Sequence, residues 1–131
     1  MQVRTSYTRL LVTDVKACFA FYRDIMEFKV IVDATHEGYA EFAAGDMKLA
    51  ISQRQEIAEI IGSDRLPLHA ECQDRAVLVF VVTDVETVCH ALKHKGIQFT
   101  REPMSNPSYD LKTAYLRDPD GNLIGIYQHV V

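Results

Sequence analysis

The tetrapeptide Val-Thr-Asp-Val occurs twice in this chain of 131 residues, at positions 12–15 and 82–85. Each copy follows an apolar run and precedes an amphipathic segment of about three turns. Thr and Asp suit the start of a helix, because their oxygens accept its free N–H groups. In the second copy Glu86 stands three residues after Thr83 and predicts a capping box. The repeat therefore predicts two copies of one strand–turn–helix module.

The pattern around both copies predicts the same order of elements, β-α-β-β-β. In the first half, strands are expected at 3–12, 28–34, 39–43 and 48–52, with a helix at 14–25. In the second half, strands are expected at 76–82, 97–101, 112–116 and 123–128, with a helix at 84–95 and a loop at 103–107. Residues 56–61 predict a short helix, and 118–122 a tight turn.

These elements predict one compact α+β domain with three segments. A first βαβββ module is expected at 1–53, a linker with the short helix at 54–74, and a second βαβββ module at 75–131.

Composition excludes several functional classes. The net charge is −4 and no basic run is present, which argues against nucleic-acid binding. No apolar run is long enough to span a bilayer, and the N-terminus lacks an apolar signal segment. The three cysteines predict neither a disulfide framework nor a Cys-pair metal site. We therefore expect a cytoplasmic protein with no membrane partner.

Three stretches carry a resemblance to a known family: Leu-Val-Thr-Asp-Val at 11–15, Phe-Ala-Phe-Tyr-Arg-Asp at 19–24, and Leu-Arg-Asp-Pro-Asp-Gly-Asn-Leu-Ile at 116–124. With them the chain resembles the vicinal-oxygen-chelate superfamily, the glyoxalase/bleomycin-resistance/dioxygenase group, over nearly its whole length except 53–74. The resemblance implies two βαβββ modules that form cupped mixed sheets. It is less specific for activity, because this fold hosts many chemistries. Where the family has Leu-Gly-Phe after the first helix, this chain has Met26, Glu27 and Phe28.

The resemblance also implies where a catalytic metal would be bound, since enzymes of the group hold one divalent ion inside the cup. The implied ligand positions carry Tyr7, Ala50, Val77 and Gly125. Side chains of Ala, Val and Gly cannot ligate a metal, and a neutral phenol is a poor ligand. We therefore expect no metal and no other cofactor.

Strand alternation predicts which side chains face the cup. The set is Tyr7, Arg9, Leu11, Lys48, Ala50, Ser52, Val77, Val79, Val81, Thr113, Tyr115, Leu123, Gly125 and Tyr127. On the third strand, either Tyr39 and Glu41 or Ala40 and Phe42 face in. The lining is mostly apolar and aromatic, as in small-molecule pockets, and Gly125 removes bulk where a metal-ligating side chain would stand. From this set we predict the ligand-binding residues Tyr7, Arg9, Lys48, Val79, Thr113, Tyr115, Gly125 and Tyr127.

Arg9 interrupts an apolar run, and such a charge must be paired or hydrated. It either anchors an anionic ligand, forms an ion pair with Glu41, or lies exposed at the sheet edge. Tyr115 also has two interpretations. The resemblance to thiol-transferring resistance proteins implies a site tyrosine, whereas core packing with a hydrogen-bonded hydroxyl is equally compatible.

Other candidate sites have weaker support. His90 and His94 have the spacing of a surface metal site, but helix periodicity favours a solvated face. His69, Glu71 and Cys72 form a mixed donor cluster that is better interpreted as a polar loop.

Three functions remain open. The first is a metal-free homodimer that sequesters or senses a small apolar or aromatic molecule, as resistance proteins do. The second is an enzyme of the same superfamily, a lyase, dioxygenase or thiol transferase, with an atypical or metal-free site. The third is a structural or regulatory module whose cup is filled by its own side chains. A homodimer is expected because one half leaves a sheet face uncovered, and Phe21, Ile57, Ile60 and Ile61 offer extra apolar contacts.

Overall fold

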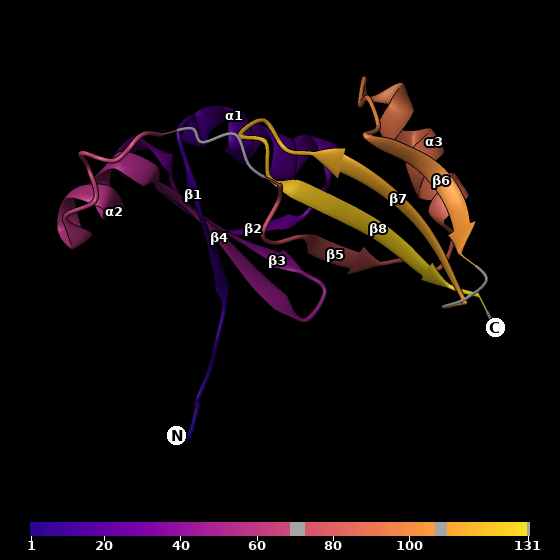
Figure 1. Cartoon of the computed structure of the whole chain (residues 1–131), viewed down its shortest axis with the longest axis horizontal. Coiled ribbons are helices and arrows are strands. Elements are labelled where there is room, and N and C mark those ends of the chain that lie inside the picture. Colours follow the sequence, from indigo (N-terminus) through magenta and orange to yellow (C-terminus); the bar gives the residue numbers. More distant parts are fainter. Residues whose placement is uncertain (69–72, 107–109, 131) are drawn as a thin grey trace. The chain divides into compact units, whose positions relative to one another are not determined.

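The computed structural model describes residues 1–68, 73–106 and 110–130 (Figure 1). The chain divides into two compact units, Met1–Glu71 and Cys72–Val131. Each unit contains one four-stranded sheet, with strand orders β1-β4-β3-β2 and β5-β8-β7-β6. In both sheets the first strand is parallel to its neighbour and the other pairings are antiparallel. The predicted fold of two βαβββ modules is thereby confirmed.

The first unit begins its sheet later in the chain than predicted, at Thr8 rather than Val3. Its elements are β1 (Thr8–Val12), α1 (Val15–Ala20), the π-helical segment η1 (Phe21–Ile25), β2 (Lys29–Ala34), the 3-10 turn η2 (Thr35–Glu37), β3 (Tyr39–Ala44), β4 (Met47–Gln53) and α2 (Arg54–Ile61). The helix expected at 14–25 thus consists of α1 followed by η1. Helix α2 lies where the short helix is expected.

Helix α1 begins at Asp14, whose carboxylate accepts a hydrogen bond of 3.0 Å from the backbone N–H of Ala17. Its buried stripe continues into η1 and packs on the middle of the sheet. The rings of Phe19 and Tyr22 lie 5.5 and 5.8 Å from the ring of Phe42, centroid to centroid. Tyr22 and Phe42 are fully buried, so this aromatic cluster forms the core of the first unit.

The second unit contains β5 (Leu78–Val81), α3 (Val85–His94), β6 (Arg101–Asn106), β7 (Leu111–Arg117) and β8 (Leu123–His129). The predicted capping box is wrong, because the N-cap residue is Asp84. Its carboxylate accepts from the backbone N–H of Thr87 at 3.2 Å, and Glu86 instead pairs with Lys112 at 2.7 Å. Helix α3 buries Val85, Cys89 and Leu92.

Strand β6 corrects two predictions, the strand at 97–101 and the loop at 103–107. The strand runs from Arg101 to Asn106 and includes Pro103, while Pro107 lies outside the described residues. Proline has no N–H for a central ladder, but β6 is an edge strand that pairs only with β7. The register also shifts between Arg101 and Met104, which is where Pro103 lies.

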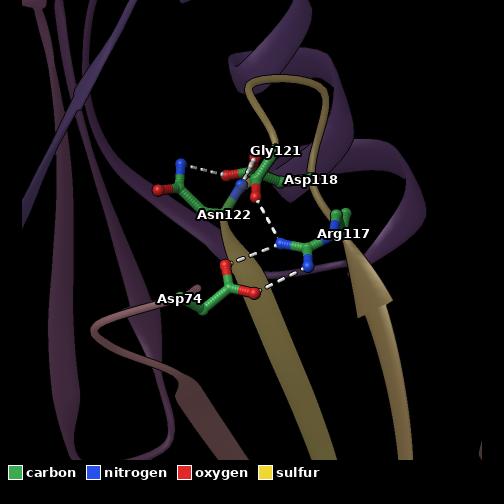
Figure 2. A network of polar contacts seen from close by, with 5 residues as sticks. All are labelled: Asp74, Arg117, Asp118, Gly121 and Asn122. Atoms are coloured by element: carbon green, nitrogen blue, oxygen red, sulfur yellow. Dashed lines mark hydrogen bonds and ion pairs between the residues drawn. The ribbon is translucent and has the colours of Figure 1, made fainter. Parts of the chain in front are cut away.

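The turn predicted at 118–122 is confirmed and is held by side chains of the second unit (Figure 2). The Asp118 carboxylate accepts from the backbone N–H and the side-chain amide of Asn122, both at 2.8 Å. Arg117 binds the Asp74 carboxylate through two hydrogen bonds of 2.8 and 2.7 Å and donates a third to the Gly121 carbonyl. The segment before β5 is therefore fastened to the β7–β8 turn.

Within the described ranges, no helix has the length and apolar character that crossing a membrane requires.

Candidate ligand-binding faces

Helix α1 packs on one face of the first sheet, and we call the opposite face the first open face. Register places Arg9 beside Ala50 on β4, and Glu41 on β3 opposite the same residue. The intervening side chains of Phe42 and Leu49 are fully buried beneath α1. This resolves the alternatives on the third strand. The first open face consists of Tyr7, Arg9, Leu11, Tyr39, Glu41, Lys48, Ala50 and Ser52.

Arg9 lies between two tyrosines of this face. Its Nη2 donates a hydrogen bond of 2.8 Å to the Tyr7 hydroxyl. The guanidinium carbon lies 5.6 Å from the centroid of the Tyr7 ring and 5.2 Å from that of the Tyr39 ring. Both distances are within the range of a cation–π interaction. The two aromatic rings therefore flank the guanidinium without neutralising its charge.

The carboxylate of Glu41 binds Lys48 and Tyr39 rather than Arg9. It pairs with Lys48 at 3.1 Å and accepts a short hydrogen bond from the Tyr39 hydroxyl. These two contacts, together with the charge of Arg9, hold the pKa of Glu41 below its ordinary value. Among the described residues Arg9 and Glu41 form no ion pair within 4.0 Å, which excludes that alternative for Arg9; its side chain is exposed on the edge strand β1, as the third alternative expected. Lys48 supplies the charge that neutralises Glu41.

A pocket of about 440 Å³ adjoins Arg9 at one end of the first open face. It lies between strands of the sheet, η2 and α2. Its lining residues are Arg9, Ala34, Glu37, Gly38, Tyr39, Ser52, Glu56 and Ile57. Arg9, which the sequence singles out, thus borders a cavity large enough for a small molecule.

The second open face lies opposite α3. Register aligns Val79 with Gly125, and places Tyr115 opposite the same glycine. The valines of β5 and Val77 just before it are exposed, with 39% of Val77, 40% of Val79 and 60% of Val81 accessible. The second open face consists of Val77, Val79, Val81, Thr113, Tyr115, Leu123, Gly125 and Tyr127. It is apolar except for hydroxyl groups.

Two tyrosines form a hydrogen-bonded pair on this face. The hydroxyls of Tyr115 and Tyr127 lie 2.6 Å apart, and their rings meet edge to face at 5.9 Å. The hydrogen bond to Tyr115, followed by burial, raises the pKa of Tyr127 to about 12. Tyr127 therefore remains a neutral phenol near neutral pH, able to hydrogen-bond but not to act as an anion.

Gly125 makes this pair possible. A Cβ atom at position 125 would lie 2.6 Å from Cε1 of Tyr127 and 3.3 Å from Cε1 of Tyr115. The space that sequence analysis assigned to a ligand is thus taken up by the chain's own tyrosine rings. The signal that could have revealed this is the pairing of Tyr115 with Gly125 and of Thr113 with Tyr127 across two adjacent strands.

The family's catalytic metal does not fit these residues. Tyr7, Ala50, Val77 and Gly125 provide one phenol and no imidazole, thiolate or carboxylate, and position 125 has no room for a longer side chain. Across the described part of the chain, no three His, Cys, Asp or Glu side chains come close enough to hold a metal.

Of the weaker candidate sites, the structure describes only the histidine pair. His90 and His94 are both exposed on α3, with ring centroids 4.8 Å apart, which agrees with a solvated helix face. The cluster of His69, Glu71 and Cys72 lies outside the described residues.

The predicted ligand-binding residues divide between the units. Tyr7, Arg9 and Lys48 lie together in the first unit, beside Tyr39, which sequence analysis offered as one of two alternatives on the third strand. The second unit holds the others, Val79, Thr113, Tyr115, Gly125 and Tyr127. Their role in binding remains a prediction.

The chain resembles known proteins in both sequence and fold. The sequence profile of the Glyoxalase/Bleomycin resistance protein/Dioxygenase superfamily matches residues 4–126. The uncharacterized protein YraH of Bacillus subtilis is 34% identical over 120 residues, covering 92% of this chain and 94% of YraH. The virulence protein STM3117 of Salmonella typhimurium is 26% identical over 130 residues, covering 97% and 85% of the two chains. A crystal structure described as a glyoxalase/bleomycin resistance protein/dioxygenase from Nocardioides has a TM-score of 0.75 at 22% identity, covering 99% of this chain and 87% of that one, a similarity of fold.

Proposed function

Because the chain belongs to the Glyoxalase/Bleomycin resistance protein/Dioxygenase superfamily, we propose that it is a metal-free member that binds a small, largely apolar or aromatic molecule. Binding without turnover would serve sequestration, as in resistance proteins, or sensing. The observation that carries this proposal is the second open face, where exposed valines lie beside a hydrogen-bonded tyrosine pair.

The chemistry of that face supports an uncharged ligand. Ligand pockets combine an apolar lining with a few well-placed polar groups, and exposed apolar patches mark interaction sites. In a pair of hydrogen-bonded phenols one hydroxyl donates to the other, so the acceptor keeps its own proton for an outside partner. Tyr115 and Tyr127 can therefore offer one hydrogen bond to a carbonyl or hydroxyl oxygen, while Val77 and Val79 contact an aromatic ring.

The residues at the family's metal positions support binding rather than metal-assisted catalysis. Ala50 is fully buried, and Gly125 lies beneath the two tyrosine rings. Neither position can polarise a substrate or activate water, which are the contributions that a catalytic metal makes in such enzymes.

A thermal-shift screen with a neutral aromatic ketone, 2-acetylnaphthalene, tests the proposal. Ligand binding to the folded state raises the melting temperature. We expect a shift that Val79→Ser and Tyr127→Phe reduce and that Val32→Ser, a matched change on an exposed valine of the first unit, preserves. The same shift in all three variants, or no shift for the wild type, would contradict binding at this face.

We also propose that the protein is a homodimer in the cytoplasm. A groove of about 260 Å³ with a mixed polar and apolar lining, Ile61 included, lies beside α2. On the same helix Ile60 and Ile61 are 72% and 69% exposed. Burying such groups against a second copy is favourable. Phe21 is itself buried and drops out of the expected contacts. Light scattering should give the mass of a dimer at micromolar concentration, and Ile60→Glu with Ile61→Glu should shift it to that of a monomer; a monomeric wild type would refute the dimer.

A further inference from the structure

We propose that the pocket beside Arg9 is a second binding site, which takes a small monocarboxylate with Arg9 as its anchor. The site lies wholly within the first unit, and the ligand class differs from the neutral molecule proposed for the second open face. The pocket, the fixed guanidinium and the charge distribution around it carry the proposal.

The guanidinium of Arg9 has no ion-pair partner among the described residues. Lys48 and Glu41 neutralise each other at 3.1 Å, and no carboxylate among the described residues pairs with Arg9 within 4.0 Å. Its Nη2 donates to an uncharged hydroxyl, that of Tyr7. A guanidinium has several N–H donors in a planar fork that matches the two oxygens of a carboxylate. Donors therefore remain for a ligand.

Arg9 is also held in position before any ligand arrives. The guanidinium carbon lies within cation–π range of the rings of both Tyr7 and Tyr39. Tyr39 is itself restrained, because its hydroxyl donates to Glu41. An arginine side chain that is already ordered loses less conformational entropy on binding, which strengthens a bidentate contact.

The pocket offers a place for the body of such an acid. Its volume of about 440 Å³ lies within the range of small-molecule sites. Ala34, Ile57 and the ring of Tyr39 provide apolar surface, and the hydroxyl of the buried Ser52 adds a polar group. The lining thus suits a ring or short chain attached to one carboxylate.

The remaining charges select against ligands with more negative charge. Glu37 and Glu56 also line the pocket, so its charged side chains are one cation and two anions. A phosphate or dicarboxylate would bring a second negative charge near these carboxylates and would be repelled. A single carboxylate can take the guanidinium while its uncharged body faces the glutamates, which is why the proposal names a monocarboxylate.

Benzoate and benzamide provide a matched pair of probes, because they share size and shape and differ in charge. We would titrate each into the full chain and follow backbone amide shifts by NMR. Benzoate should shift amides around Arg9, Tyr39 and Ser52, and benzamide should bind roughly tenfold more weakly or worse. Inorganic phosphate should bind more weakly than benzoate.

Variants of arginine localise the effect. Arg9→Gln should weaken benzoate binding by roughly tenfold or more, and Arg9→Lys should restore part of it, because Lys keeps the charge and loses the fork. Arg23→Gln is the matched control, since Arg23 lies in the same unit but pairs with Asp24 at 2.7 Å. Its affinity for benzoate should equal that of the wild type.

Several results would overturn the site. They are equal affinity for benzoate and benzamide, unchanged binding in Arg9→Gln, preferential binding of phosphate, or no benzoate-dependent shifts in the pocket. Because the first comparison uses the wild type, it holds even if a variant misfolds. A response to 2-acetylnaphthalene that persists while benzoate fails would overturn this site and leave the proposed function intact.

Discussion

The two units share one topology and differ in what their open faces present. At matched register, Arg9 lies beside Ala50 in the first unit, and Val79 lies beside Gly125 in the second. The first open face carries an arginine, a lysine and a glutamate, whereas the second carries valines and a tyrosine pair. The helix-facing sides remain alike, with buried apolar residues in both. The buried sides therefore define the module, and the open faces define its chemistry.

The helices of the two units also end differently. Gly96 follows α3 with φ of 89°, and Glu27 occupies the corresponding place after η1 with φ of 58°. In each unit the next backbone N–H returns to the helix, from Ile97 to Leu92 and from Phe28 to Tyr22. The residue with positive φ is thus glycine in one unit and a strained glutamate in the other, and the returning hydrogen bond spans five residues after α3 and six after η1.

Cavities on the buried sides should have the largest effect and should be similar in the two units. Phe42 and Leu116 are fully buried beneath their helices. Phe42→Ala should cost about 3–5 kcal/mol of unfolding free energy, and Leu116→Ala about 2–5 kcal/mol. Denaturant unfolding measures both. A loss below about 1 kcal/mol in one unit alone would contradict the equivalence of the modules, because an effect that small is typical of surface substitutions.

Substitution of Gly125 should have the next largest effect on stability. The matched position of the first open face carries Ala50, whereas at position 125 the tyrosine rings leave no room for a side chain. Gly125→Ala pushes a methyl group against Tyr127 and should cost about 1–3 kcal/mol, as overpacking does. Combining it with Tyr127→Ser removes the ring and should recover much of that loss relative to Tyr127→Ser alone. Additive losses in the double variant, measured by denaturant unfolding, would mean that the tyrosine pair does not occupy this space.

Substitutions at the two helix ends should change stability less, and in opposite directions. Gly96→Ala places a side chain at positive φ and should destabilise by about 1–2 kcal/mol. Glu27→Gly relieves that strain, and the gain should stay below about 1 kcal/mol because glycine also loses more backbone freedom on folding. Thermal unfolding would show the pair of shifts, and a destabilised Glu27→Gly would mean that the glutamate side chain outweighs its backbone strain.

The smallest predicted effect is on the pH dependence of stability, which should differ between the two open faces. Because the pKa of Glu41 is lowered on folding, its contribution is present above its ordinary value of 4.5 and is lost as the pH falls through the lower folded value. The raised pKa of Tyr127 contributes below its ordinary value of 10.0, and this is lost as the pH rises towards about 12. Melting temperatures should therefore depend less on pH in acid for Glu41→Gln, and less in base for Tyr127→Phe. Wild-type slopes in both variants would contradict these assignments.

Local patterns in the sequence were enough to predict the modules. The repeated Val-Thr-Asp-Val, the buried stripes of α1 and α3, and the turn at 118–122 all depend on residues close together in the chain. Strand β6 was misplaced because Pro103 normally breaks strands, and its tolerance at a sheet edge is known only once the strand order is known.

The candidate sites were harder to predict, because their contacts cross strands. An Arg9–Glu41 pair, one of the three alternatives for Arg9, is plausible by charge, but across the strands Glu41 pairs with Lys48 and Arg9 contacts two tyrosines. The role of Gly125 likewise depends on which rings lie over it. Alternation predicts the face of a side chain but not its partner on that face.

Elemental analysis of untagged, undialysed protein tests the central claim, a superfamily member that works without a metal, most directly. We predict no stoichiometric zinc, iron, manganese or nickel, because the family's ligand positions carry Tyr7, Ala50, Val77 and Gly125. One equivalent of metal per chain would contradict the claim if it disappeared in Tyr7→Phe and survived the replacement of both His90 and His94.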